Sequence, residues 1–316
     1  MAKFPSQRKI IYEAPDISKT TMSSVGHINV FKDLSILNRR GYAQTTKKGV
    51  PLVVQAKVDW YLQDDLGTGP ATAPGSDLQA TMKMTGVQNN WVIKNAAVKW
   101  HAALQAMRKK AGVTKSMVGT YAHEIRYNYD VANDTWLDSI DGDGNAFTGG
   151  TWDVTRFADA QDASYQLKLV GSAISEEVST GVSVLQLGTS YLASRRQPDT
   201  DSNEGIDESP ALFSHLNDLL APNEDGRSDE VIAFTRDDGD NVPYDEYTGE
   251  TDPDISESVE LGRAVAGFGN AYGSTIMEIP FGLADLRAQA HDAASTNTTF
   301  NGLIALEVLD IYEMQG

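Results

Sequence analysis

The feature that most constrains the fold is a long succession of short alternating segments separated by turn residues. About eleven segments alternate apolar and polar side chains, as strands with one buried face do. Only two segments carry the apolar repeat of an amphipathic helix. A doubly wound α/β fold needs helices between successive strands, so two helices are too few for it. The sequence therefore predicts a mainly β protein, an antiparallel β-sandwich or barrel with insertions.

The expected strands are spread along most of the chain. They include residues 27–31, 50–62, 78–87, 120–131, 164–170, 182–192, 230–235, 255–268, 275–281 and 303–312, and a short apolar run at 10–12 could add an edge strand to a neighbour or lie along a surface. The last of these is apolar on both faces apart from Glu307 and Asp310, which is typical of a central strand.

The clearest helix is predicted between Asn90 and Ala111. Asn90 can cap its start, and Gly112 can end it in the left-handed conformation. Apolar residues at helical spacing define one face, which includes Trp100, and we expect His101 and most of the basic residues on the other. A second helix is predicted from Ser209 to about residue 221, because a capping serine precedes a proline there.

Charge divides the chain into two halves. Residues 1–126 hold 18 Lys and Arg against 8 Asp and Glu, whereas residues 127–316 hold 8 against 36, which gives +10 and −28. Such asymmetry favours one side that meets a polyanion and another that meets solvent, unless the two regions simply coexist in salty surroundings. The candidate contacts with nucleic acid or an anionic inner layer are Lys3, Arg8, Lys9, Arg39, Arg40, Lys47, Lys48, Lys99, Arg108, Lys109 and Lys110.

No motif points to catalysis. The chain has no cysteine, which removes disulfides, thiolate nucleophiles and Cys-ligated zinc. It has five histidines but no HExxH, GxSxG or Walker A motif, so we expect neither an enzyme nor a bound cofactor. We also expect no membrane span, because no run of about 18 apolar residues occurs.

One acidic loop resembles the start of a calcium site. Asp141, Asp143 and Asn145 place oxygen ligands at alternate positions, as in an EF-hand loop. Ala146 and Trp152 stand where that loop needs Gly and Glu, so this is not an EF-hand. Two interpretations of this loop stay open: a looser calcium site at these three residues, or a solvated turn.

The domain prediction follows from these segments. Residues 1–25 are expected to form a basic N-terminal arm, and residues 26–316 a single β-sandwich domain with insertions. Long acidic loops are expected near residues 197–208 and 236–254.

The layout resembles the major capsid proteins of small tailless icosahedral viruses. The resemblance lies in the basic arm, the many short strands that end in the strand 303–312, the helix 91–111, and the long loops. It implies a jelly-roll sandwich that assembles with copies of itself and other virion proteins into a shell around genomic nucleic acid. A single jelly roll is favoured over a double one, which needs about sixteen strands. The arm is poorer in arginine than in many such proteins.

The alternative is a secreted carbohydrate-binding β-sandwich assisted by calcium. It accounts for the acidic loops and for Trp136 and Trp152 as exposed aromatic residues, but not for the basic first half. A β-rich hydrolase has no motif in its favour.

Overall fold

The structure is a computed structural model of the chain. It describes residues 5–63, 79–114, 124–130, 136–147, 152–158, 164–171, 174–177, 182–195, 258–266, 272–291 and 299–315. These ranges contain twelve strands and three helices. The chain divides into two units, residues 1–191 with 249–316 and residues 192–248, and the fold below is that of the first unit.

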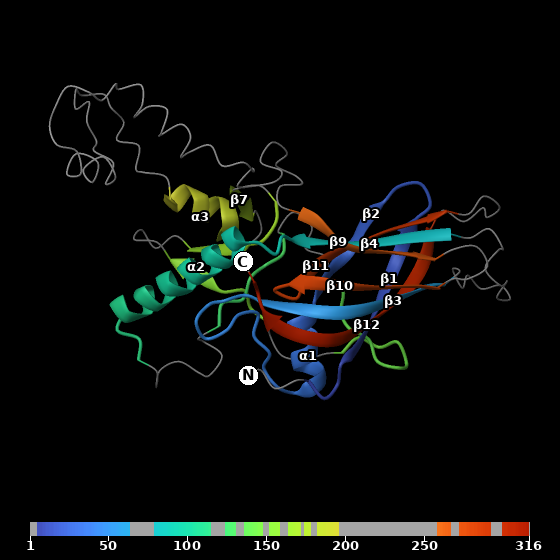
Figure 1. The fold of residues 1–316 in the computed structure, drawn as a ribbon, viewed down its shortest axis with the longest axis horizontal. Coiled ribbons are helices and arrows are strands. Elements are labelled where there is room, and N and C mark those ends of the chain that lie inside the picture. Colours follow the sequence, from blue (N-terminus) through green and yellow to red (C-terminus); the bar gives the residue numbers. More distant parts are fainter. Residues whose placement is uncertain are drawn as a thin grey trace, which may run out of the picture. The chain divides into compact units, whose positions relative to one another are not determined.

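Eight strands build two four-stranded antiparallel sheets that pack face to face (Figure 1). Sheet A has the order β1 (Lys9–Ser18), β12 (Thr299–Glu313), β3 (Leu52–Gln63), β10 (Tyr272–Pro280). Sheet B has the order β2 (Ser23–Asn29), β11 (Leu283–His291), β4 (Gln79–Val87), β9 (Ser258–Ala266). The prediction of a mainly β protein with an antiparallel sandwich is confirmed.

The strand pairs are nested, which means that each pair lies, in the sequence, between the two strands of the pair before it. β1 pairs with β12, β2 with β11, β3 with β10, and β4 with β9, all antiparallel. The β12–β3 and β11–β4 ladders then join these pairs into the two sheets. Because the nesting ends at β4 and β9, residues 88–257 form one insertion between two neighbouring strands of sheet B.

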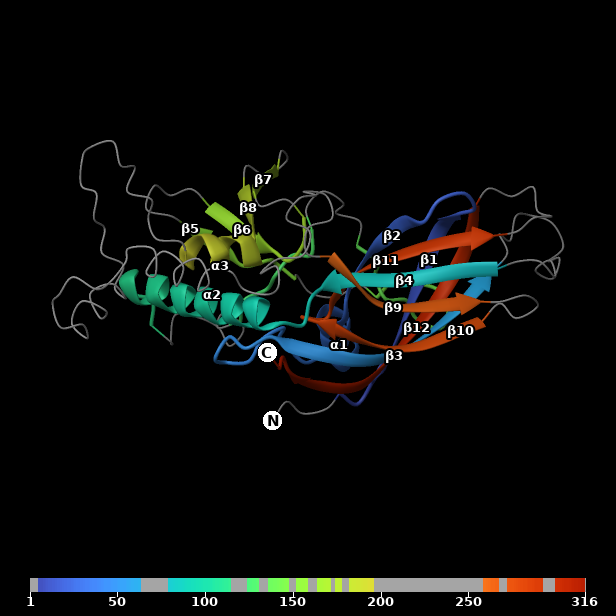
Figure 2. The same ribbon diagram turned by 45° about the horizontal axis from the view of Figure 1, so that its top comes forward.

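The described part of the insertion contains two helices and a small sheet (Figure 2). The helices are α2 (Trp91–Lys110) and α3 (Leu187–Arg195), and the sheet has the order β5 (Arg156–Ala158), β6 (Ser164–Lys168), β8 (Val182–Gln186), β7 (Ile174–Glu177). Trp100 of α2 contacts the rings of Phe157 and Tyr165, with centroids 5.1 and 5.9 Å away. Its indole N–H donates to the Ser190 hydroxyl of α3 at 3.0 Å.

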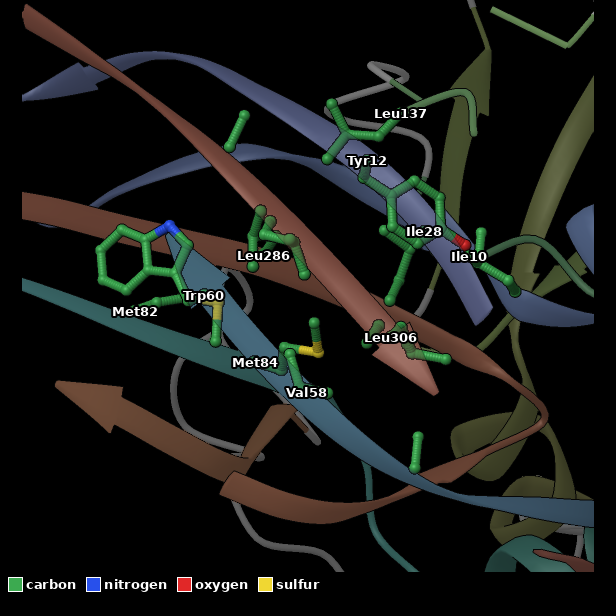
Figure 3. Close-up of a cluster of buried hydrophobic side chains, with 14 of the residues drawn as sticks. Ile10, Tyr12, Ile28, Val58, Trp60, Met82, Met84, Leu137, Leu286 and Leu306 are labelled. Atoms are coloured by element: carbon green, nitrogen blue, oxygen red, sulfur yellow. The ribbon is translucent and has the colours of Figure 1, made fainter. Parts of the chain in front are cut away.

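The core lies between the two sheets and is filled from alternate positions of each strand. Figure 3 shows Tyr12 and Trp60 of sheet A with Met82, Met84 and Leu286 of sheet B in this layer, and all five are fully buried. The two-residue period of a strand sends these side chains inward and their sequence neighbours outward.

The prediction of an N-terminal arm at residues 1–25 is wrong for most of that segment. Residues 9–18 form β1 and residues 23–29 form β2, so most of the segment 1–25 belongs to the sandwich rather than to a free arm. The physical reason is the alternation of Ile10, Tyr12 and Ala14, which are buried at every second position. The rest of the domain prediction is not tested, because the acidic loops at 197–208 and 236–254 lie outside the described residues.

The predicted strand 27–31 also ends earlier than expected, because α1 (Val30–Asn38) begins there. The Asn29 side chain accepts a hydrogen bond from the Lys32 amide at 3.0 Å and thereby caps the helix. Val30, Phe31 and Leu34 are buried at helical spacing. The apolar patch at 34–37, for which the alternation gives no structure, is therefore part of this helix.

Three further differences concern segments of weak pattern. Residues 187–192 belong to α3 rather than to a strand, and residues 124–130 are irregular apart from a bridge between Asn128 and Lys168. The pattern does not predict β11, because three of its nine residues are alanine and one is aspartate, and both are poor strand formers.

The remaining predictions within the described residues agree with the structure. Strands 50–62, 78–87, 164–170, 255–268 and 275–281 correspond to β3, β4, β6, β9 and β10. β12 is central in sheet A, between β1 and β3. The helix 209–221 and the strand 230–235 lie outside the described residues.

Replacing Trp60 with alanine should test the packing between the sheets. Trp60 is completely buried, so Trp60→Ala should lower the free energy of unfolding by about 3–5 kcal/mol. The adjacent Tyr61 points outward and is 41% exposed, so Tyr61→Ala should cost less than about 1 kcal/mol. Urea denaturation of both variants measures the difference, and equal losses would contradict the assigned faces of β3.

Candidate functional site

The structure separates the predicted basic residues into two groups. The first, here called the α1 group, consists of Arg8, Lys9, Arg39 and Arg40. Asn38 joins the two segments that carry these residues, because its side chain accepts a hydrogen bond from the Gln7 amide at 2.9 Å and donates one to the Gln7 carbonyl at 3.0 Å. All four cations are exposed.

Acidic and aromatic side chains lie beside the α1 group. Lys9 is the cross-strand partner of Glu307, which is also paired with Lys57 on its other side. The Arg40 guanidinium lies 5.8 Å from the centre of the Tyr42 ring. The charge of this group is therefore partly balanced within the chain.

The second group, here called the α2 group, consists of Lys47, Lys48, Lys99, Arg108, Lys109 and Lys110. Lys47 and Lys48 are exposed on a turn in which the Thr46 amide donates to the Val50 carbonyl at 2.8 Å. Gly49 of this turn rests on α2, and a Cβ at Gly49 would collide with the Cβ of His101. The turn thus adds two exposed cations from a separate segment of the sequence to the His101 side of α2.

The local sequence explains the shape of α2. The Asn90 side chain accepts from the Ile93 amide at 3.0 Å, and Gly112 ends the helix with a φ of +71°, as predicted. The prediction that His101 faces solvent is wrong, because its side chain is buried. It stands four residues after Ala97 and three before Leu104, at the edge of the buried face of α2, and the turn at 46–49 covers it.

The remaining members of the α2 group differ in exposure. Lys109 and Lys110 are exposed, whereas Arg108 is half-buried, and this desolvation lowers its pKa from the usual value. The Lys99 ammonium lies 5.6 Å from the centre of the Tyr191 ring. Lys3 lies outside the described residues.

The acidic loop at Asp141 is a hydrogen-bonded turn. The Asp141 carboxylate accepts from the amides of Asp143 and Asn145, both at 2.9 Å, and these bonds lower its pKa. No group of three His, Asp or Glu side chains that could hold a metal occurs among the described residues. The calcium site at Asp141, Asp143 and Asn145 stays a prediction, since the asparagine lies outside that set of ligand types.

A buried carboxylate to which the sequence does not point connects three segments. Asp33 of α1 is 1% exposed and accepts from the hydroxyls of Tyr12 at 2.6 Å and Ser139 at 3.1 Å. Desolvation raises the pKa of Asp33 to about 6, although both hydrogen bonds oppose that shift. The contacts tie β1, α1 and the segment 136–147 together.

A second cluster surrounds the buried carboxylate of Asp285 in β11. Its carboxylate accepts from the Ser24 hydroxyl at 2.5 Å and from the Arg287 Nε at 2.8 Å, and His27 Nδ1 lies 3.7 Å away. Ser24 donates to Asp285 rather than to His27, so the cluster lacks the bond between nucleophile and base that a serine hydrolase requires. No sequence spacing could indicate this cluster, because Ser24 and Asp285 come from opposite ends of the chain.

Among the described residues, no helix combines the length and the apolar character that crossing a membrane would require.

The pH dependence of stability should report on Asp33. Its folded pKa of about 6 exceeds the unfolded value of 3.8, so the stabilisation from protonation is complete below pH 3.8 and is lost as the pH rises through 6. Between pH 4 and 7 the wild type should lose roughly 2–3 kcal/mol of stability that Asp33→Asn does not lose. Denaturation at a series of pH values measures this, with the more exposed Asp138→Asn as the control. Parallel curves for the wild type and Asp33→Asn would rule out the assigned burial.

No protein-family model matches this chain, and no curated protein or solved structure matches it either.

Proposed function

We propose that this chain is a structural virion protein, a capsid subunit that assembles with copies of itself into a closed icosahedral shell. The observation that carries the proposal is the nested pairing of eight strands, with β1 to β4 paired in reverse order with β12 to β9. Nested pairing of four strand pairs in two sheets supports a jelly roll, an architecture common in viral capsid and lectin domains.

The strand count supports a single jelly roll. Sheets A and B contain four strands each, whereas a double jelly roll would need about sixteen. The small third sheet, which contains the parallel pair β6 and β8, belongs to the insertion and adds no strand to either layer.

The outer face of sheet A offers apolar surface for subunit contacts. Tyr61 and Ile276 are 41% and 61% exposed there, and the ring centroids of Tyr61 and Tyr272 are 5.1 Å apart. Lys57 and Glu307 are neighbours on the same face, so apolar and charged groups alternate on it. Association of copies through such surfaces would remove apolar area from water.

The charge distribution supports an orientation within the shell. The basic N-terminal half would be on the side of the genomic nucleic acid, and the acidic loops would face solvent. Other virion proteins are further partners in this proposal. Its only role is assembly, without catalysis or a required cofactor.

The alternative function, a carbohydrate-binding module, expects Trp136 and Trp152 to be exposed aromatic residues. Trp152 is partly buried against the core, and the Arg126 guanidinium lies 4.7 Å from its ring centre. Trp136 is partly buried as well, with its ring 5.9 Å from that of His27. Neither indole is as exposed as that alternative expects.

The size of the purified protein tests the proposed function. Light scattering and negative-stain microscopy at low and high salt should show uniform closed particles, or pentameric or trimeric capsomers that close into particles when the salt is changed. Salt should matter because like-charged subunits repel one another less when screened. A monomer throughout the salt range would contradict the proposal.

A further inference from the structure

We infer that α2 and the turn 46–49 form one site that binds the backbone of a nucleic acid without regard to base sequence, and that the α1 group does not. The inference deepens the proposed function and depends on it only for identifying this nucleic acid as the packaged genome. It places the contact on an inserted helix rather than on the N-terminal segment, most of which is part of the sandwich.

The first observation is a segment without acidic residues. Between Asp77 and Glu124 the sequence has seven Lys and Arg and no Asp or Glu. At the average frequency of this chain, in which 44 of 316 residues are acidic, about six would be expected there. Helix packing alone does not exclude carboxylates from an exposed face, and on most helices they would pair with lysines at i+4.

The second observation is the contact between the turn and the helix. Gly49 has a φ of +84° and lies directly on His101, where a larger residue would collide with the imidazole. This close approach places the turn on the His101 side of α2, about 80° around the helix from Lys109 and about 160° from Lys99. The Thr46 hydroxyl accepts from the Val50 amide at 3.2 Å and further orders the turn. The lysines therefore extend from a packed turn rather than from a loose one.

The third observation is the arrangement of charge along α2. Lys99 and Lys109 are on the exposed stripe of the helix, with Ala102 and Ala106 between them. At 1.5 Å per residue, these two lysines are separated by about 15 Å along the axis. The small side chains between them leave room for a sugar–phosphate backbone to approach the helix while the lysines contact phosphates on either side.

The helix dipole accounts for only part of this charge. Arg108, Lys109 and Lys110 stand in the last turn of α2, where cations stabilise the negative end of the dipole. The effect is confined to that turn, so it does not explain Lys47, Lys48 or Lys99.

The side chains indicate the class of ligand. Five of the six cations are lysines, which act as point charges toward phosphate rather than as planar forks that read base edges. The one tryptophan in the middle of α2, Trp100, is occupied by Phe157, Tyr165 and Ser190. Because these contacts already engage the indole, affinity is expected to come mainly from phosphates and the release of counterions.

A rival ligand is present in the same chain. Residues 197–257 contain 19 Asp and Glu against two Arg, so this stretch of a second copy is also polyanionic. The phosphate backbone is favoured because it presents charge at a regular and closer spacing. Binding of the acidic stretch instead is one of the outcomes that the experiment separates.

Two matched variants of the full chain test the site. The first replaces Lys47, Lys48, Lys109 and Lys110 with Gln, and the control replaces Arg8, Lys9, Arg39 and Arg40 with Gln. Each removes four exposed cations. Binding to a fluorescein-labelled 30-mer of deoxythymidine is followed by anisotropy from 50 to 300 mM salt, and melting curves establish that both variants are folded.

The wild type and the control should bind the 30-mer alike, within about threefold. The first variant should bind on the order of 100-fold more weakly near 100 mM salt, and its slope of log affinity against log salt should be smaller by about 3. Equal losses in both variants would overturn the inference, as would no binding by the wild type. Normal binding by the first variant together with loss of salt-sensitive self-association would overturn it in favour of the acidic stretch.

Particle size measured on the same samples separates this inference from the proposed function. A monomer that binds the 30-mer through α2 supports the site and contradicts the shell. Particles that assemble normally but show no difference between the two variants support the shell and contradict the site.

Discussion

The pairing of the two ends of the chain is the interaction on which the rest of the fold depends. β1 and β12 are the first and last strands, yet Ile10 to Ala14 run in continuous register with Leu306 to Gly302. Every inner pair of the nest is enclosed by this outer one. Because contacts of such sequence separation cost much loop entropy, the sandwich cannot form from local signals alone. Its stability rests on the buried layer between the sheets, to which each pair contributes at every second position.

The strands that the sequence predicts are those in which an apolar face repeats clearly. β3 is an example, because Val54, Ala56, Val58 and Trp60 alternate with polar residues. β11 escapes prediction although it lies inside sheet B, since its alanines are apolar but weak strand formers and Asp285 is held by partners distant in sequence. α1 escapes it for a related reason: nine residues give little more than two turns, and the capping role of Asn29 is unremarkable until the helix is seen.

The sequence predicts the candidate site residue by residue, but not its organisation. Composition alone selects the lysines and arginines, and it cannot tell which of them meet. The separation into an α1 group and an α2 group depends on two contacts, that of Asn38 with Gln7 and that of Gly49 with His101. His101 stands four residues after Ala97 and three before Leu104, so its helical position permits burial, and the turn at 46–49 completes it. The roles of Asp33 and Asp285 cannot be predicted from the sequence, because the sequence does not show whether an aspartate is surrounded by water or hydrogen-bonded to a buried hydroxyl.

The position of the insertion has a consequence for how such a chain can change. Val87 and Ser258 are register partners at the ends of β4 and β9, so the segment 88–257 leaves and re-enters the sandwich at points as close as those of a short hairpin. Lengthening a closed loop costs free energy only logarithmically. The length of the insertion is therefore of little consequence for the sandwich, although its segment 136–147 packs on β1 and α1 through Leu137 and Ser139. Those parts of the insertion that do not contact the sandwich can be lengthened or exchanged while the eight strands keep the same pairing.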